Sequence, residues 1–394
     1  MRYLLLRLKR FCGFITGFVF FLSGIVKLMD PVGAGLVMKE YLDFLHIGFL
    51  GFASKPLGVL FALAETIVGT GLITGVWRRI IAPTAIALQG FFTFLTLLLV
   101  IFNPEMDCGC FGEAIHLTHA QTFIKNLVLM ALLLIYYIPS RHLGETRKKK
   151  YVSFGIVTLS VVAFTIYSWL YIPLIDFTDF KPAAALQAGN AFQTPEEDMY
   201  EAYFIYEKDG TQERFTLGHL PDSTWTFVTS ETVLKKEYED ALVNLSFYDN
   251  DGEYHDTLAA GGKVMVISVY APKKINEREW KRIGAFIADA QDTGFRPIIL
   301  VAGTEEDIPE QYSGMTYQSD YKTLIALNRS NGGVTYFSNG YLIRKWAERA
   351  LPDKEKLTET ADGDDTETLI GEDANRSLTF QGFLLYVFAV MLLL

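Results

Sequence analysis

Apolar residues in this chain gather in long runs, and five of these runs lie in its first half. They cover about residues 11–29, 56–76, 80–102, 119–138 and 151–174. Each approaches or exceeds the roughly 20 residues that a helix needs to cross the hydrocarbon core of a bilayer. The pattern therefore predicts five transmembrane helices.

The first and last apolar segments need separate arguments. The first follows Arg2, Arg7, Lys9 and Arg10, as in a signal peptide, but no small-residue cleavage site follows it and further spans come after it. We therefore expect a retained helix. The last 17 residues, 378–394, are also apolar and predict a sixth helix at the short limit for a span. Charge does not decide whether this segment crosses the membrane or docks on it.

Basic residues predict the orientation of these helices. The N-terminal cluster, Arg78 with Arg79, and the loop at 141–150 fall at alternate ends of successive helices, so all three can face the cytoplasm. This places the N-terminus in the cytoplasm and the loops at about 30–55 and 103–118 on the outer face. We expect an inner-membrane protein whose residues 176–377 are periplasmic.

Charge divides the chain in the same way. Residues 1–175 carry 15 Lys/Arg against 8 Asp/Glu, whereas the rest carries 20 against 37, within a total net charge of −10. A strongly acidic external part repels phosphates. Membrane lipid is thus an expected partner of the first part, and nucleic acid is not a partner.

Residues 176–350 alternate strand and helix signals. Buried-strand runs at 262–270 and 296–303 flank an amphipathic helical run at 275–294, and a hairpin signal follows at 332–347. Strand-like pieces between 191 and 260 predict an additional layer. An α/β domain with a mixed sheet is expected. Residues 351–377 are acidic and poor in large apolar side chains, which predicts a disordered tether.

The order of these elements resembles the thioredoxin fold. In that family, redox cysteines follow the first central strand, where this chain has Ala271-Pro272-Lys273-Lys274. No cysteine occurs after residue 110, and Gly332 stands where the family has its cis-proline. The resemblance implies a thioredoxin-like domain without redox chemistry that binds or positions something. An unrelated α/β domain is the alternative.

Two of the three cysteines, Cys108 and Cys110, lie in "DCGCFG" on the predicted outer face. Cys12, at the opposite end of its helix, lies a bilayer thickness of about 30 Å from them. Paired cysteines on an oxidising face are expected to form a disulfide. A Cys-x-Cys bridge closes a small, strained ring, and strained bridges exchange readily. This pattern favours redox-active cysteines.

Two other interpretations of these cysteines stay open. A structural bridge would stabilise little, because so short a loop gains little from cross-linking. A zinc or copper(I) site could use Cys108, Cys110, His116 and His119. The spacing of Thr118 and Gln121 matches a capping box, which predicts that a helix begins there.

Polar residues at membrane depth extend the candidate site. Glu65 lies within the second apolar run, and an ionisable group there indicates function by default. Lys27, near the outer end of the first helix, is expected to reach Glu65, and Asn126 lies at similar depth. Together they would form a polar patch beneath the thiols. A buried ion pair that only fixes helix packing is the alternative.

Three segments carry a family resemblance: "FFLSGIVKLMDP", "ALAETIVGTGLITG" and "DCGCFG". They resemble the DoxX/MauE family of redox-associated membrane proteins over about residues 8–140, and the longer layout is similar to the enlarged form found in Bacteroidetes. The resemblance implies a four-helix bundle like that of vitamin K epoxide reductase. It also implies thiol–disulfide roles for Cys108 and Cys110 and site roles for Lys27 and Glu65. A quinone as electron carrier follows only by analogy with that bundle.

The expected architecture is a membrane bundle at 1–140, a cytoplasmic loop and fifth helix at 141–175, an external domain at 176–350, a tether at 351–377 and a final apolar segment at 378–394. The leading functional hypothesis is an inner-membrane thiol–disulfide redox protein that acts on, or matures, a periplasmic disulfide-containing partner. The alternatives are a non-enzymatic assembly or scaffold protein and a metal-handling protein.

Overall fold

The structure is a computed structural model that describes residues 2–115, 117–137, 146–187, 200–208, 211–216, 220–222, 224–234, 242–304 and 307–393. The chain forms two compact units. The first comprises Met1–Phe177 and Ala374–Leu394, and the second comprises Thr178–Asp373.

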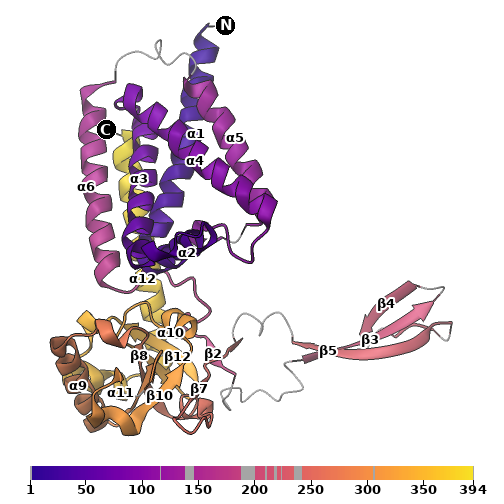
Figure 1. The fold of residues 1–394 in the computed structure, drawn as a ribbon, viewed down its shortest axis with the longest axis vertical. Coiled ribbons are helices and arrows are strands. Elements are labelled where there is room, and N and C mark those ends of the chain that lie inside the picture. Colours follow the sequence, from indigo (N-terminus) through magenta and orange to yellow (C-terminus); the bar gives the residue numbers. More distant parts are fainter. Residues whose placement is uncertain are drawn as a thin grey trace. The chain divides into compact units, whose positions relative to one another are not determined.

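Six helices among the described residues are long and apolar enough to cross a membrane. Five of them confirm the predicted spans, and the sixth contains the final apolar segment (Figure 1). They are α1 (Arg2–Met29), α3 (Ser54–Thr74), α4 (Arg78–Phe102), α5 (His119–Tyr137), α6 (Lys148–Leu170) and α12 (Asp365–Leu393).

Small residues bring α1 and α3 into contact along their backbones. A Cβ added to Gly69 would lie 2.5 Å from the main-chain nitrogen of Phe21 and 2.6 Å from the carbonyl oxygen of Gly17. In lipid, where helices gain little from hydrophobic burial, such close packing is a main source of helix association. This contact places the middle of α1 directly against the second half of α3.

The final helix runs antiparallel to α6. Lys150, in the first turn of α6, donates from Nζ to the carbonyl oxygen of Met391 at 2.8 Å, and Ser153 donates to that of Val390 at 2.7 Å. Further along, Phe164 stacks on Phe383 with ring centroids 4.7 Å apart. The apolar part of α12 therefore lies beside α6 for most of its length, as expected of a sixth membrane helix.

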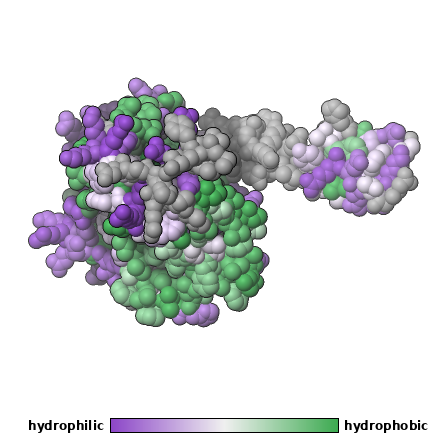
Figure 2. Space-filling model, turned by 90° about the horizontal axis from the view of Figure 1, so that it is seen from above, coloured by the Kyte–Doolittle hydropathy of each residue, from purple (hydrophilic) through white to green (hydrophobic). Residues whose placement is uncertain are grey.

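Large hydrophobic side chains also cover the outside of the first unit. Exposed examples on α4, α5 and α6 include Phe94, Ile101, Ile124, Val128 and Leu159. Hydrophobic residues form a broad area in the space-filling view (Figure 2). Such a surface is too large for a soluble monomer and fits contact with lipid.

The two segments predicted as outer loops contain short elements. The first holds α2 (Pro31–Phe44), followed by a 3₁₀ turn at Gly48–Ala53. Asp30 caps α2 by accepting from the main-chain N–H of Gly33, and Pro31 occupies the first helical position, where proline is favoured. The second segment holds β1 (Cys110–Glu113). A helix between the first two spans was not predicted.

The second unit contains an eight-stranded mixed sheet in the order β6-β2-β12-β11-β8-β9-β10-β7. Neighbours β8, β9 and β10 are parallel, whereas β11 pairs antiparallel with both β8 and β12. The strands are β2 (Ala185–Leu186), β6 (Leu242–Val243), β7 (Phe247–Tyr248), β8 (Lys263–Val269), β9 (Arg296–Val301), β10 (Thr316–Ser319), β11 (Gly333–Ser338) and β12 (Tyr341–Trp346).

The helices of this unit are α9 (Glu277–Asp292), α10 (Tyr321–Leu327) and α11 (Lys354–Asp362), with 3₁₀ turns at Asp256–Leu258, Pro272–Lys274, Glu310–Met315 and Glu348–Ala350. The expected strand, helix, strand and hairpin at 262–347 are therefore confirmed. Asn339 and Gly340 turn the hairpin with φ of 48° and 84°, as the sequence signal required.

A separate three-stranded antiparallel sheet, in the order β4-β3-β5, accounts for the strand-like pieces before residue 240. Its strands are β3 (Tyr200–Lys208), β4 (Thr211–Thr216) and β5 (Thr226–Leu234).

The prediction of a disordered tether at 351–377 was wrong. The segment forms α11 and the first part of α12. Leu357 is fully buried in the core of the second unit, and Ala361 of α11 and Leu369 of α12 pack against that core. Arg344 also forms an ion pair with Glu372. The few apolar residues of both helices thus contact the core, which the acidic composition obscured.

Candidate functional site

Cys108 and Cys110 lie in the connection between α4 and α5. Asn103 ends α4 in the left-handed conformation, with φ of 42°. At the other end, Thr118 N–H donates to Oε1 of Gln121 at 3.0 Å, and Gln121 N–H donates to Oγ1 of Thr118 at 3.3 Å. The predicted capping box is confirmed, and it fixes where the cysteine loop enters α5.

Side chains from two other helices hold the carbonyl groups of both cysteines. Tyr41 of α2 donates its hydroxyl to the carbonyl oxygen of Cys108 at 2.8 Å. Ser23 of α1 lies 2.6 Å from the carbonyl oxygen of Cys110. Gly109, between them, has φ of +57°, and a Cβ there would lie 2.1 Å from Cγ1 of Val37. The loop therefore requires glycine at this position for both conformation and space.

The two thiols differ in exposure and in their partners. Both are free, with Cys108 only 4% exposed and Cys110 partly accessible. The Cys108 sulfur lies 2.9 Å from Oγ1 of Thr122 and 3.1 Å from the carbonyl oxygen of Leu117.

Hydrogen bonding between the thiols moves their acidities in opposite directions. The Cys110 thiol donates to Cys108, and together with the Thr122 hydroxyl this lowers the pKa of Cys108 to about 5 against the opposing effect of burial. The same hydrogen bond, followed by burial, raises the pKa of Cys110, while Lys125 and Lys27 act to lower it. Of the two sulfurs, Cys108 is therefore the one whose thiolate is favoured.

Beneath the loop lies the expected ion pair. Nζ of Lys27 lies 2.8 Å from Oε1 and 2.9 Å from Oε2 of Glu65, whose side chain is only 3% exposed. Ser23 Oγ lies 2.8 Å from Oε2 of the same carboxyl group. The predicted contact between Lys27 and Glu65 is thus confirmed, and Ser23 connects it to Cys110.

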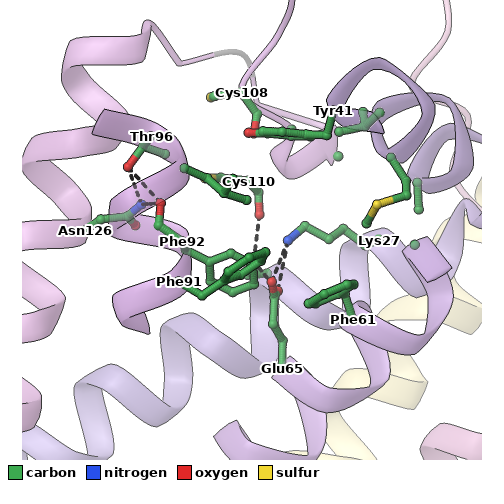
Figure 3. Close-up of a pocket in the computed structure, with 18 of the residues that line it drawn as sticks. Lys27, Tyr41, Phe61, Glu65, Phe91, Phe92, Thr96, Cys108, Cys110 and Asn126 are labelled. Atoms are coloured by element: carbon green, nitrogen blue, oxygen red, sulfur yellow. Dashed lines mark hydrogen bonds and ion pairs between the residues drawn. The ribbon is translucent and has the colours of Figure 1, made fainter. Parts of the chain in front are cut away.

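These groups surround one cavity of about 330 Å³ in the first unit (Figure 3). Its walls are mostly apolar and aromatic, with Phe61, Phe91 and Phe92 among them, and Phe61 stacks on Phe91 with ring centroids 5.7 Å apart. Both cysteines line it. The polar lining consists of Ser23, Lys27, Tyr41, Glu65, Gln89, Thr96, Lys125 and Asn126.

Asn126 lines the cavity together with Lys27 and Glu65, as predicted, but its side-chain amide is hydrogen-bonded to α4. The side-chain nitrogen donates to Oγ1 of Thr96 at 3.2 Å, and Gln89 donates to the main-chain carbonyl of Asn126 at 3.0 Å. These bonds tie α4 to α5 on one side of the cavity.

Other candidate residues lie apart from the thiols. Cys12 is buried in a hydrophobic cluster with Leu133 and Tyr136, as expected for a packing residue. The ring nitrogens of His119 lie 2.9 Å from the carbonyl oxygen of Met106 and 3.3 Å from Oδ1 of Asn103. His119 thus braces the loop. His116, the fourth residue of the metal hypothesis, lies outside the described residues.

Sequence reasoning missed three polar side chains of the site: Ser23, Tyr41 and Thr122. Each is a hydroxyl in or beside an apolar helix, where hydroxyls commonly bond within their own helix. For Thr122 and Ser23, the sequence signal available was their position relative to the predicted site residues. Thr122 is in the first turn of the helix that follows the cysteines, and Ser23 precedes Lys27 by one helical turn on the same face.

A second cluster, in the other unit, could in principle hold a cation. Ligand atoms of Asp249, Glu253 and His255 lie within 4.8 Å of one another. Asp249 already accepts from the main-chain N–H groups of Asp251 and Glu253, and His255 lies 2.6 Å from it. These bonds are those of a tight turn, which accounts for the cluster.

Comparison with known proteins gives matches to parts of the chain. Residues 3–139 match the family model of the methylamine utilisation protein MauE, and residues 200–237 match a domain family of unknown function, DUF8463. Protein TlpB of Flavobacterium psychrophilum is 26% identical over 178 residues, which is 42% of this chain and 45% of that protein. The chain thus spans less than half of this relative in the matched region. No solved structure matches. The membrane unit, with its cysteine loop, is therefore similar to MauE proteins.

Proposed function

We propose that this protein is a membrane thiol–disulfide redox protein that oxidises the thiols of an extracytoplasmic partner through Cys108 and Cys110. The observation that carries this proposal is the asymmetry of the pair. Cys108 is buried, and hydrogen bonds with the Cys110 thiol and the Thr122 hydroxyl lower its pKa, whereas Cys110 keeps accessible surface. The similarity to MauE proteins supports a membrane role of this kind.

The asymmetry assigns a role to each sulfur. In the disulfide form, a partner thiolate reaches the accessible sulfur of Cys110 and bonds to it, the bridge breaks, and Cys108 leaves as a thiolate. A second partner thiol then displaces Cys110, which leaves with a proton, and the partner gains a disulfide. Two electrons pass from the partner to the pair. A leaving thiol of low pKa leaves faster, which favours cleavage in this sense.

The hydrogen bonds of the pair also favour electron transfer from the partner's thiols to the Cys108–Cys110 disulfide. Hydrogen bonds from the Cys110 thiol and the Thr122 hydroxyl stabilise the reduced pair. Stabilising the dithiol form makes the disulfide a stronger oxidant, since the potential measures the balance between the two forms. Strain in the small Cys-x-Cys ring acts in the same direction.

The cavity fits an apolar electron acceptor. A membrane quinone, which the bundle resemblance implies, would lie against Phe61, Phe91 and Phe92, with Lys27 at its polar end, 5.6 Å from the centroid of Phe92. When bound, it would accept the two electrons of the dithiol. The cavity thus offers such a molecule an apolar space, the ammonium group of Lys27 and the sulfur atoms of Cys108 and Cys110.

We assign the second unit to partner docking, with residues 178–373 in the periplasm and the bundle in the inner membrane. The chain has no cysteine after residue 110, so this unit contributes no thiol. The turn after β8 is Ala271-Pro272-Lys273-Lys274, the place where a thioredoxin-like domain would carry its cysteines.

A redox titration tests the proposal. Membranes carrying the Cys12→Ser variant are equilibrated with thiol–disulfide buffers, quenched with acid and alkylated with a reagent that shifts the gel band. We expect a reversible transition at a potential well above about −300 mV, below which structural bridges lie. A pair that resists reduction, or thiols that react only after a chelator is added, would contradict the redox role.

A further inference from the structure

The helices around the cavity are held against one another in different ways. Between α1 and α3, a Cβ added to Gly24 would lie 2.6 Å from the carbonyl oxygen of Ala62, so the two backbones touch. Between α2 and α3, a Cβ on Gly58 would lie 2.6 Å from the carbonyl oxygen of Ala34. Hydrogen bonds of Asn126 join α4 to α5. Backbone packing or hydrogen bonds would have to break before a ligand could pass at any of these three places.

The boundary between α3 and α4, the α3–α4 seam, is closed by side chains instead. Near the joined ends of the two helices, a Cβ added to Gly71 would lie 2.8 Å from the side chain of Ile81, so they pack closely there. From that contact the helices diverge (Figure 1). Phe61 lies ten residues before Gly71 and Phe91 ten residues after Ile81, which is about 15 Å along each helix. Their rings stack across the seam with centroids 5.7 Å apart.

Phe91 belongs both to the cavity lining and to the outer surface of the bundle. It lines the cavity and is nevertheless 43% exposed. It lies near the middle of α4, a candidate span of 25 residues, roughly 16 to 20 Å from either end. In a bilayer with a hydrocarbon core of about 30 Å, the surface at this height faces lipid tails. The cavity therefore reaches the surface of the unit at a place where hydrocarbon, and not water, lies outside.

The aromatic pair costs less to open than the other helix contacts. Stacking of two rings adds an amount equivalent to roughly a twofold to tenfold change in an opening equilibrium. Each phenylalanine ring can also turn about its side-chain bonds without breaking a main-chain hydrogen bond. The backbone contacts at Gly24 and Gly58 have no such freedom, because no side chain lies between the helices there. Rotation of Phe61 and Phe91 is therefore the easiest way into the cavity from lipid.

The route and the interior together limit what can enter. A molecule that arrives through hydrocarbon is uncharged, because an isolated charge is strongly disfavoured there. Inside, the aromatic walls suit a flat ring, and the ammonium group of Lys27, 5.6 Å from the ring centroid of Phe92, suits a hydrogen-bond acceptor on that ring. A volume of about 330 Å³ is at the small end for ligand sites, so a long tail would stay in the seam and the bilayer.

We propose that the α3–α4 seam is a lateral entrance from the bilayer to the cavity, that Phe61 and Phe91 form its gate, and that it admits a flat, uncharged ring with an apolar tail. This inference rests on the proposed function, in which such a molecule is the electron acceptor. The protein partner then reaches the cysteine loop from the outer face, while the acceptor arrives from the side. The two reactants therefore do not compete for one entrance.

Tryptophan fluorescence in phosphatidylcholine vesicles tests the entrance, after subtraction of the signal of the unchanged protein with its five tryptophans. Phe91→Trp places a reporter in the seam, and Phe94→Trp places a matched reporter on the exposed surface of α4, outside the cavity lining. Decylubiquinone should quench the Phe91→Trp variant in a saturable way, as a bound molecule does. It should quench the Phe94→Trp variant only in proportion to its concentration in the lipid. Phospholipids with brominated tails should quench both reporters.

The outcomes separate this proposal from the redox function. Proportional quenching in both variants, or protection of the Phe91→Trp reporter from brominated lipid, would overturn the entrance. A reversible redox titration of the cysteines in the same protein would then leave the redox function intact. Saturable quenching in a protein whose cysteine pair resists reduction would instead support the entrance and overturn the redox function.

The rate of quenching tests the gate. Phe61→Ala, combined with Phe91→Trp, removes the stacking partner, so saturable quenching should develop roughly two to ten times faster after rapid mixing with decylubiquinone. Phe61→Leu, which keeps an apolar side chain but no ring, should act in the same direction if the alanine variant does not fold. Leu60→Ala is the matched control, because Leu60 is exposed on α3 and lies outside the cavity lining. Equal rates in the Phe61 and Leu60 variants would overturn the gate.

Discussion

Two turns in this protein lead into helices in the same way and yet differ in chemistry. The cysteine loop enters α5 through the capping box of Thr118 and Gln121, and the turn after β8 enters α9 through the capping box of Asn276 and Glu279. Both helix starts are stabilised locally. Only the first turn carries thiols. Its carbonyl groups contact the hydroxyls of Tyr41 and Ser23 from other helices, whereas in the second turn Asn331 bonds both the N–H and the carbonyl of Ala271.

The features specific to the cysteine loop are therefore its thiols and the side chains around them. At Cys108, the favourable partners are the Cys110 thiol and the hydroxyl of Thr122. Tyr41 and Ser23 fix the loop in the conformation that makes these contacts. The following predictions separate the chemistry of the cysteine loop from the simple helix starts, beginning with the largest effect.

Replacing either cysteine should abolish disulfide exchange but with different products. Cys108→Ser leaves the accessible sulfur at Cys110, so it should accumulate a mixed disulfide when treated with a bulky, charged disulfide that is too large for the cavity beside Cys108. Cys110→Ser leaves only a buried sulfur and should form little adduct. Mass spectrometry of the intact protein measures the adduct, with Cys12→Ser as the background. Equal labelling of both variants would contradict the assigned roles.

Gly109→Ala should disrupt the loop. The left-handed conformation costs a residue other than glycine about 1–2 kcal/mol, and the new Cβ would collide with Val37. We expect a lower unfolding temperature in detergent and a loss of fast Cys108 alkylation near pH 6. Gly51→Ala is the matched control, because no atom lies within 4 Å of its added Cβ and its φ is not positive. Similar losses in both variants would show that the effect is not specific to the loop.

Thr122→Val should weaken the thiolate while preserving the fold. A hydrogen bond to a charged group contributes about 1.5–3 kcal/mol, so the pKa of Cys108 should rise from about 5 by roughly 1 to 2 pH units. Alkylation needs the thiolate, so the pH giving half the maximal rate should move upward by the same amount. Thr93→Val is the control, since that hydroxyl bonds only to Gln89 in its own helix. An unchanged profile would rule out Thr122 as a stabilising partner.

Asn276→Ala should have the smallest effect, and it should lower the local stability of the second unit alone. Loss of the cap costs about 1 kcal/mol of helix stability. Hydrogen exchange should become roughly five times faster in the first turn of α9, and Cys108 alkylation should be unchanged. A change in thiol reactivity would show that the two helix starts are energetically coupled.

The parts of the site that sequence reasoning predicted are those with a strong local or periodic signal. The apolar runs and the capping box could each be found in one stretch of chain, and Lys27 and Glu65 could be found because each is an ionisable residue within an apolar helix. Ser23 and Tyr41 could not, because they contact carbonyl groups of the cysteine loop that lie 87 and 67 residues away in the chain. Thr122 is only 14 residues from Cys108, but its contact depends on how the loop folds onto α5. The acidic segment after 350 shows the opposite error, since its charge content concealed the helical spacing of Leu357 and Ala361 on α11 and the core contact of Leu369 on α12.

The cavity beside Cys108 also makes this protein a target for covalent chemistry. A small electrophile with a flat apolar body would stack on Phe61 and Phe91 and present its reactive carbon to a thiolate that is almost closed to water. Bulky, charged reagents would be excluded by the same walls. Selectivity for this cysteine over other cellular thiols would then come from shape and acidity together, which gives a route to an activity-based probe.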